Sequence, residues 1–170
     1  SGGNGGTGTY KYELRNGSTV LAAWTQTTAM SYTHGSNLPS GTYSLYVIEE
    51  DSVGNWSTEG SGETTVDVDG PTKPTFTAEP SSPTDDTTPM WSWLSGGGGD
   101  GTFRHRLNGA AWSTTTSTTY TSSALAHGDH IFDVQERDAL GNWSLSASST
   151  VSVDTTPPVA LVARKGNDLT

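Results

Sequence analysis

Two residue patterns in this sequence could support catalysis, and each lacks the context that its chemistry requires. Glycines spaced as G-x-G-x-x-G, which can cradle dinucleotide phosphates, occur at residues 3–8 and 96–101. That chemistry needs a helix to begin after the glycines, but both segments run into sequences typical of β-strands. Serine, histidine and aspartate occur without a G-x-S-x-G nucleophile turn. The four histidines do not cluster with acids at zinc-ligand spacing. We therefore expect neither a cofactor site nor enzymatic activity.

The elements that would position functional residues are repeated within the chain. The phrase EEDSVGNWS at residues 49–57 returns as ERDALGNWS at 136–144, and GTYKYEL at 8–14 matches GTFRHRL at 101–107. Repetition over such a distance is typical of a structural unit used more than once. Residues 74–94 precede the glycine-rich loop of the second copy, whereas the first copy begins at that loop. We expect the chain to begin and end inside a repeat.

Composition narrows the class of protein. The net charge is −10 with only 8 Lys and Arg residues, so neither a nucleic-acid partner nor a basic membrane-binding face is expected. No segment is long and apolar enough to cross a bilayer. Cysteine is absent, which excludes disulfides and thiolate metal sites. Hydrophobic residues make up 31% of the chain and fall in short alternating runs, which predicts thin β-sandwich cores.

Alternating runs predict the strands of the second copy. Because side chains two positions apart in a strand point the same way, Trp91 and Trp93 share one face, and Phe132 and Val134 point inward together. The phrase D-x-x-G-N supplies the glycine and asparagine of a tight turn before the last strand. The expected strands are 75–79, 90–94, 102–107, 118–122, 130–137 and 142–154.

The segments GTYSLYVIEEDSVGNWS…VDVDGPTKP and GDHIFDVQERDALGNWS…VSVDTTPP resemble the bacterial Ig-like repeats of large surface proteins and adhesins. The resemblance implies an all-β chain of two tandem Ig-like antiparallel β-sandwiches. Residues 1–69 would be an incomplete domain (strands C to G) without its two N-terminal strands, and residues 70–154 a complete domain. Residues 155–170 would be a tail, either the first strand of a next repeat or a donor strand. In such sandwiches a tyrosine near the start of strand F braces the neighbouring corner. Tyr43 has that place, and His130 stands there in the second copy.

The same resemblance implies a role without catalysis, as a stalk, spacer or filament subunit outside the cell or on a bacterial cell surface. Its partners would be further copies of the chain or adjacent repeats of a longer one. The alternative is a carbohydrate-binding or accessory module of a secreted protein. In that case the six tryptophans would hold glycan instead of packing in the cores.

Acidic residues near the ends of the expected sandwiches are candidate calcium ligands. Related adhesin repeats stiffen their joints with calcium, which takes about 6–8 oxygen ligands. The copies carry no tight D-x-D-x-D loop, so the same acids would equally cap turns and keep the surface soluble. The candidates are Asp69, Asp138 and Asn142 at one pole, and Asp85, Asp86 and Asp154 at the other.

The first copy lacks the two strands that should cover Tyr12, Leu14, Leu45 and Val47. Losing five inward apolar side chains removes roughly 7–15 kcal/mol, which equals the whole stability of a typical domain. The first copy should therefore need β-structure from a neighbour. A strand that is apolar on both faces is normally buried, so the tail could be donated to another copy and build a head-to-tail filament. The candidate donor residues are Val159, Ala160, Leu161, Val162 and Ala163.

Overall fold

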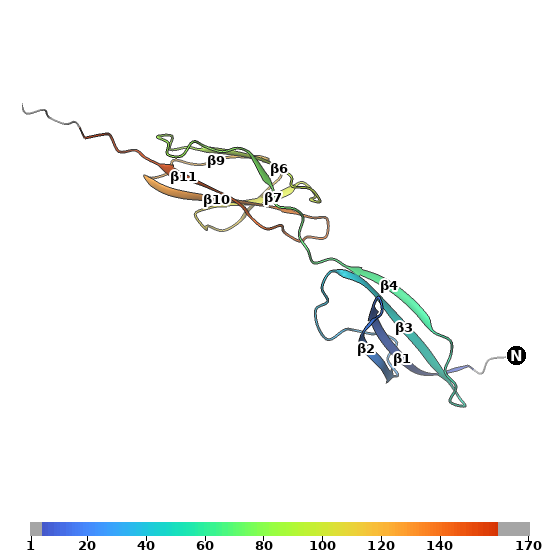
Figure 1. Ribbon diagram of the computed structural model, residues 1–170. Helices are drawn as coiled ribbons and strands as arrows, with labels where there is room; N and C mark the ends of the chain where they lie inside the picture. Colours follow the sequence, from blue (N-terminus) through green and yellow to red (C-terminus); the bar gives the residue numbers. More distant parts are fainter. Residues whose placement is uncertain (1–4, 160–170) are drawn as a thin grey trace, which may run out of the picture. The chain divides into compact units, whose positions relative to one another are not determined.

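The structure is a computed structural model that describes residues 5–159, and these residues form strands, turns and loops without a helix (Figure 1). The chain divides into two compact units, Ser1–Asp69 and Gly70–Thr170. All pairings between the strands are antiparallel. The prediction of an all-β chain built from antiparallel sheets is therefore confirmed.

The described part of the first unit forms one four-stranded sheet with the order β2-β1-β3-β4. Tyr12 pairs with Val47, and Leu14 pairs with Leu45 across β1 and β3. Because directly opposed residues point to the same side of a sheet, these four apolar side chains share one face. The strands are β1 (Gly6–Asn16), β2 (Thr19–Thr27), β3 (Gly41–Asp51) and β4 (Gly60–Val66).

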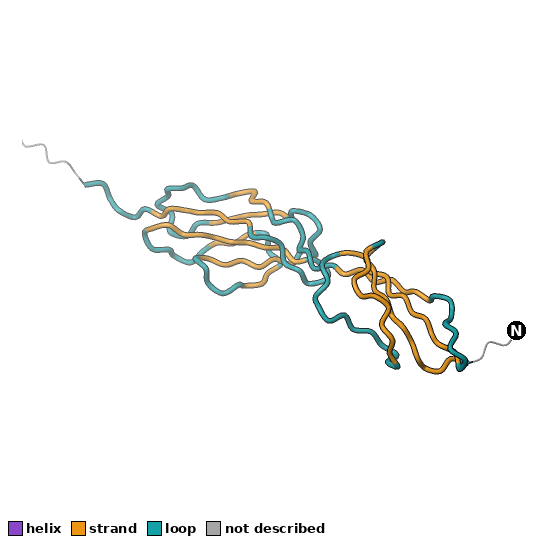
Figure 2. The backbone as a smooth tube through the Cα atoms, turned by 60° about the horizontal axis from the view of Figure 1, so that its bottom comes forward, coloured by secondary structure: helices purple, strands orange, loops and turns teal. Residues whose placement is uncertain are grey.

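The second unit has two sheets, which form two layers with the core between them (Figure 2). One sheet has the order β11-β10-β7-β8 and the other has the order β5-β6-β9. The predicted inward pairs are confirmed, since Trp91, Phe132 and Val134 are 0% exposed and Trp93 is 1% exposed. The strands are β5 (Thr75–Ala78), β6 (Met90–Leu94), β7 (Thr102–Leu107), β8 (Ser113–Thr115), β9 (Thr119–Thr121), β10 (Gly128–Arg137) and β11 (Ala147–Val153).

The sheet of the first unit corresponds strand by strand to one sheet of the second. Strands β1, β2, β3 and β4 match β7, β8, β10 and β11 in sequence position and in sheet order. Strands β5, β6 and β9, which form the second layer of the second unit, have no counterpart among the strands in the described part of the first unit.

The repeated phrase forms the same turn in both units. The Asp51 carboxylate accepts hydrogen bonds from the backbone N–H groups of Val53 and Asn55 at 3.0 and 2.8 Å. In the second unit the Asp138 carboxylate accepts the two equivalent bonds at 2.9 and 2.8 Å. The glycines of the two turns have φ angles of 88° and 98°, in the left-handed region that glycine adopts without strain. The aspartate, glycine and asparagine of the phrase are thus all used by the turn itself.

The final strand of the second unit is shorter than the sequence predicts. β11 begins at Ala147, whereas the alternating pattern suggests a strand from residue 142. Trp143 pairs with Arg137 through an isolated bridge only, and the Ser144 hydroxyl donates to the carbonyl of Leu145 at 2.9 Å. This local hydrogen bond competes with the ladder and delays the strand.

The tyrosine corner is present in both units, although one has no tyrosine there. The Tyr43 hydroxyl donates to the carbonyl of Pro39 at 2.7 Å. In the second unit His130 Nε2 lies 2.9 Å from the carbonyl of Ala126, which is also four residues upstream. The side-chain amide of Asn108 lies 2.8 Å from His130 Nδ1. Because that amide donates to Nδ1, the proton sits on Nε2 and the histidine makes the same brace.

The glycine-rich loops serve packing. A Cβ atom on Gly99 would lie 2.0 Å from the side-chain carboxyl carbon of Glu136, and one on Gly6 would lie equally close to that of Glu49. Glu136 is 0% exposed and accepts a hydrogen bond from the Ser95 hydroxyl at 2.7 Å. The loops run into β7 and β1, so glycine is needed here where the backbone passes close to a glutamate.

Candidate interaction site

An apolar groove lies on the inner face of the sheet in the first unit. Tyr12 and Leu14 of β1 and Leu45 and Val47 of β3 form its floor, and its volume is about 580 Å³. The edge strand β4 borders the groove with residues that include Gly60 and Gly62. None of the strands described in this unit lies over these side chains. The face that the sequence predicts to be uncovered is therefore open in the structure.

The loop between β2 and β3 covers part of this face, which the sequence does not predict. The Tyr12 hydroxyl donates to the carbonyl of Ala29 at 2.7 Å, and the Tyr12 ring lies 6.0 Å from the ring of Tyr32. Tyr12 is consequently only 9% exposed, and Leu14 is 5% exposed. Leu45 and Val47 remain partly exposed, so the open area centres on β3.

The equivalent face of the second unit shows what normally covers these positions. Trp91 of β6 stacks on Phe132 with the ring centroids 4.8 Å apart, and Trp93 lies 5.7 Å from the same ring. The Trp91 indole N–H also donates to the hydroxyl of Ser149 at 3.0 Å. Phe76 of β5 adds a third aromatic ring, 6.2 Å from Phe132. Two strands thus fill this face with three aromatic side chains.

Three exchanges place smaller side chains on the face of the first unit than on the matching face of the second, and so leave more room above it. In each exchange the first unit has a smaller residue than the second at the corresponding position of the paired strands. A Cβ atom on Gly62 would meet nothing within 4 Å, whereas Ser149 is only 5% exposed. The exchanges are Leu45 for Phe132, Gly60 for Ala147 and Gly62 for Ser149.

The edge strands β11 and β4 of the two units also differ in their backbone pairing. In the second unit, the segment between β5 and β6 pairs in parallel with β11 through Thr84 and Val153. The N–H of Thr84 donates to the carbonyl of Ser152 at 2.9 Å, and the N–H of Asp154 donates to the carbonyl of Thr84 at 2.8 Å. Along β4, the described residues form no such bridge. The described part of the first unit therefore lacks the edge contact as well as the second layer.

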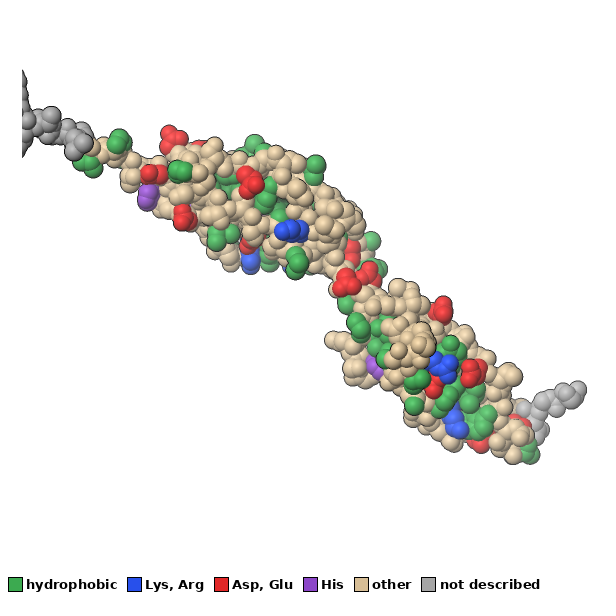
Figure 3. All heavy atoms as spheres, in the orientation of Figure 1, with side chains coloured by type: hydrophobic (Ala, Val, Ile, Leu, Met, Phe, Trp, Pro, Cys, Tyr) green, Lys and Arg blue, Asp and Glu red, His purple; other side chains and the backbone are tan. Residues whose placement is uncertain are grey.

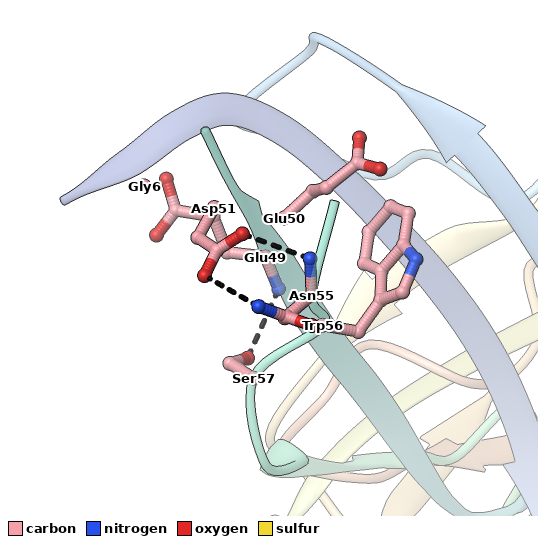
Figure 4. Close-up of a pocket in the computed structure, with 7 residues that line it drawn as sticks. All are labelled: Gly6, Glu49, Glu50, Asp51, Asn55, Trp56 and Ser57. Atoms are coloured by element: carbon pink, nitrogen blue, oxygen red, sulfur yellow. Dashed lines mark hydrogen bonds between the residues drawn. The ribbon is translucent and has the colours of Figure 1, made fainter. Parts of the chain in front are cut away.

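A small pocket of about 250 Å³ lies at the repeated turn of the first unit and is lined by several of its residues (Figure 4). Hydrogen bonds from the backbone and side chain of Asn55 lower the pKa of Asp51. For Asp138, burial raises the pKa, but hydrogen bonds from Asn142 and neighbouring backbone groups outweigh it, so the net pKa is lowered. Figure 4 shows Asn55 held by Asp51 through two hydrogen bonds. These carboxylates are engaged in holding their turns.

The candidate calcium ligands at the far pole lie close together in the backbone, but the carboxylates of Asp86 and Asp154 bond to groups of their own neighbourhood. Asp154 follows β11 and bonds through its N–H to Thr84, next to Asp85. Its carboxylate accepts hydrogen bonds from Thr156 and lies 3.3 Å from Nδ1 of His127. The Asp86 carboxylate accepts two bonds from Thr88, at 2.8 and 3.0 Å.

The ligands predicted for the other pole are divided between the units. Asp138 and Asn142 bond to each other within one turn, and Asp69 ends the first unit. In the described part of the chain, no three His, Cys, Asp or Glu residues gather as a metal-binding group. Calcium binding stays a prediction.

Most of the predicted donor strand falls outside the described residues. Val159 is described, and it is 93% exposed. Ala160, Leu161, Val162 and Ala163 lie outside the described residues. Donation of this strand therefore also stays a prediction.

The tryptophans on the outer face of the second unit are interleaved with arginines. The Arg104 guanidinium lies 4.7 Å from the ring centroid of Trp112 and 4.3 Å from that of Trp143. Arg106 lies 4.4 Å from Trp112. In the first unit the Lys11 ammonium lies 4.0 Å from the ring of Trp56. On the first unit, basic (blue) and hydrophobic (green) side chains lie next to each other in Figure 3. These contacts are cation–π pairs within the fold.

Comparisons with known proteins found similarity to solved structures only. The structure is similar to fibronectin(III)-like modules of Clostridium thermocellum CbhA, with 19% identity, 84% of this chain and 77% of that chain covered, and a TM-score of 0.40. It is also similar to chicken CNTN1 FN1-FN3 domains, with 14% identity, 85% and 56% of the two chains covered, and a TM-score of 0.36. No protein-family model and no curated protein matches the sequence. Among the described residues, no helix has the length and apolar character to cross a membrane.

Proposed function

We propose that this chain is a structural module without catalytic activity, which acts as a stalk or spacer in an extracellular protein of the bacterial surface type. The observation that carries the proposal is the parallel bridge between Thr84 and Val153 in the second unit. It joins a segment near the entry of the unit to its last strand. A tension along the chain pulls these two segments in opposite directions along their length. The hydrogen bonds between them are then loaded in shear and resist together.

The use of the aromatic residues supports a structural role over the alternative of a glycan-binding module. Trp91 and Trp93 are 0% and 1% exposed, so they offer no platform to a sugar ring. Trp112 and Trp143 present ring faces to Arg104, and a sugar stacking there would compete with the guanidinium. Four of the six tryptophans are thus engaged inside the second unit.

Force measurement on single molecules tests the mechanical role. The chain has no cysteine, so single cysteines introduced at Asp69 and Thr155 give unique attachment points on either side of the second unit. Thr84→Pro removes the N–H that donates to Ser152, and it should lower the force at which this unit ruptures. Ser81→Ala changes an exposed neighbour and is the matched control. A wild-type rupture force no higher than that of the proline variant would count against the mechanical role.

A glycan array tests the alternative with the same protein. A spacer should bind no glycan. Saturable binding that Trp112→Ala abolishes would instead establish the carbohydrate-binding module.

A further inference from the structure

We propose that the open face of the first unit is an acceptor for a pair of strands of the β5–β6 type, which carries two large apolar side chains two positions apart. This inference rests on the proposed function, because it treats the units as variants of one structural repeat. The occupant is defined by its chemistry: one strand with two bulky inward side chains, and a second strand that adds a further aromatic side chain.

The match between the two units supports this occupant. The floor positions of the groove have the same register as the face under β6, since Leu45 occupies the place of Phe132 and Val47 that of Val134. In the second unit this floor is covered by Trp91 and Trp93. The smaller floor residues Leu45, Gly60 and Gly62 leave room above β3 in the first unit, so the groove can take large aromatic side chains.

The area that such a strand pair buries is sufficient for stable association. Three aromatic side chains bury about 150–250 Å² each, or roughly 450–750 Å² together. With an equal area on the groove, the total is roughly 900–1,500 Å², which reaches the range of stable protein interfaces. In the tail, Val159, Leu161 and Ala163 would face inward, and these side chains are too small to fill a groove of about 580 Å³. The tail also follows an Asp-containing, Pro-rich joint as β5 does, so it corresponds to β5 and not to β6.

The replacement of Ser149 by Gly62 predicts which aromatic side chain the acceptor face prefers. In the second unit the indole N–H of Trp91 donates to the Ser149 hydroxyl at 3.0 Å. Gly62 stands at the matching position and has no hydroxyl to accept that bond. A buried donor without an acceptor is unfavourable. The acceptor face should therefore prefer phenylalanine over tryptophan at the place of Trp91.

A fusion protein tests the proposal in the full chain. A second copy of residues 74–94 is attached directly before Ser1, so that it precedes the first glycine-rich loop as the original precedes the second. The fusion should raise the melting temperature of the first unit by at least about 10 °C. It should also reduce the binding of the apolar dye ANS at least about fivefold, because the exposed apolar surface is covered. The matched control carries Trp91→Ser and Trp93→Ser in the added copy only.

A reciprocal substitution tests the preference. Trp91→Phe in the added copy should leave the first unit at least as stable as the tryptophan version. The same substitution in the original position should lower the stability of the second unit, because Ser149 then loses its donor.

Three results would overturn the proposal. The first is a fusion no more stable than its double-serine control. The second is displacement of ANS from the unfused chain by a synthetic peptide of residues 155–170, which would make the tail the occupant. The third is a clear loss of stability with phenylalanine in the added copy. The force measurement on Thr84 reports on the second unit only, so a failed fusion and a failed mechanical role are distinguishable.

Discussion

Truncating the matching floor residues Leu45 and Phe132 should have very different effects, because one face is open and the other is covered. Phe132 is 0% exposed and lies 4.8 Å from Trp91 and 5.2 Å from Tyr120. Phe132→Ala therefore leaves a cavity and should cost the second unit about 3–5 kcal/mol. Leu45→Ala removes three carbon atoms that are only partly buried. At ~0.8 kcal/mol per fully buried carbon and about half burial, its cost is about 1 kcal/mol. No closed cavity forms to add to that cost.

Hydrogen exchange measured by mass spectrometry resolves the two effects, because it reports the opening free energy of each unit separately. Leu45→Ala should raise the exchange rates of the β3 amides by less than about tenfold, whereas Phe132→Ala should raise those of β10 by about two orders of magnitude or more. The reasoning is refuted if Leu45→Ala costs the first unit 3 kcal/mol or more, the value for a covered leucine. Such a result would mean that the face is already covered in solution.

Four further predictions concern single groups. Burial lowers the pKa of His105 below its ordinary value of about 6.5. The second unit should therefore have its full stability above that pH and lose part of it as the pH falls through the lowered pKa; urea unfolding at pH 8 and pH 5 should show this loss, and His105→Tyr should remove it. Arg104→Met should destabilise the second unit by about 1–2 kcal/mol because two cation–π contacts are lost, as measured by urea unfolding, with Arg104→Lys retaining part of the effect. Asp138→Asn should lower the stability of the second unit at pH 7, and the difference from the wild type should vanish as the pH falls through the lowered pKa of the aspartate, as followed by acid unfolding. If the far-pole acids hold calcium, calcium should raise the melting temperature of the second unit, and Asp86→Asn should abolish that rise. Calorimetry with calcium and with a chelator measures this difference in melting temperature.

The strands could be predicted from the sequence wherever alternation alone specifies which side chains are buried. Trp91 and Trp93 are two positions apart in a short run, so their common burial follows from the geometry of a strand. The repeated turn could also be predicted, because its hydrogen bonds connect residues no more than four positions apart. The beginning of β11 could not be predicted, since a local bond of Ser144 interrupts an otherwise continuous pattern.

The features that the sequence does not reveal depend on contacts between distant strands. Arg104 lies between Trp112 and Trp143, which are 8 and 39 positions away in the sequence. Their meeting depends on the register of three neighbouring elements. The contact between the loop at Ala29 and Tyr12 could not be predicted either, because nothing in the pattern of a Ser/Thr-rich loop indicates where the loop packs. The sequence shows that His130 replaces the corner tyrosine, but only the structure shows that the histidine keeps the contact to the carbonyl four residues upstream.

The two copies differ at positions whose side chains contact a covering strand, and they agree at positions whose side chains bond within their own turn. The turn residues Asp51 and Asp138 bond to their own loops, so their roles are complete within each unit. Leu45 and Gly62 face the groove, and their counterparts Phe132 and Ser149 are matched to the indole of Trp91. A change at such a position is favourable only together with a change in the covering strand. The differences between these faces are therefore evidence about the strand that each face accepts.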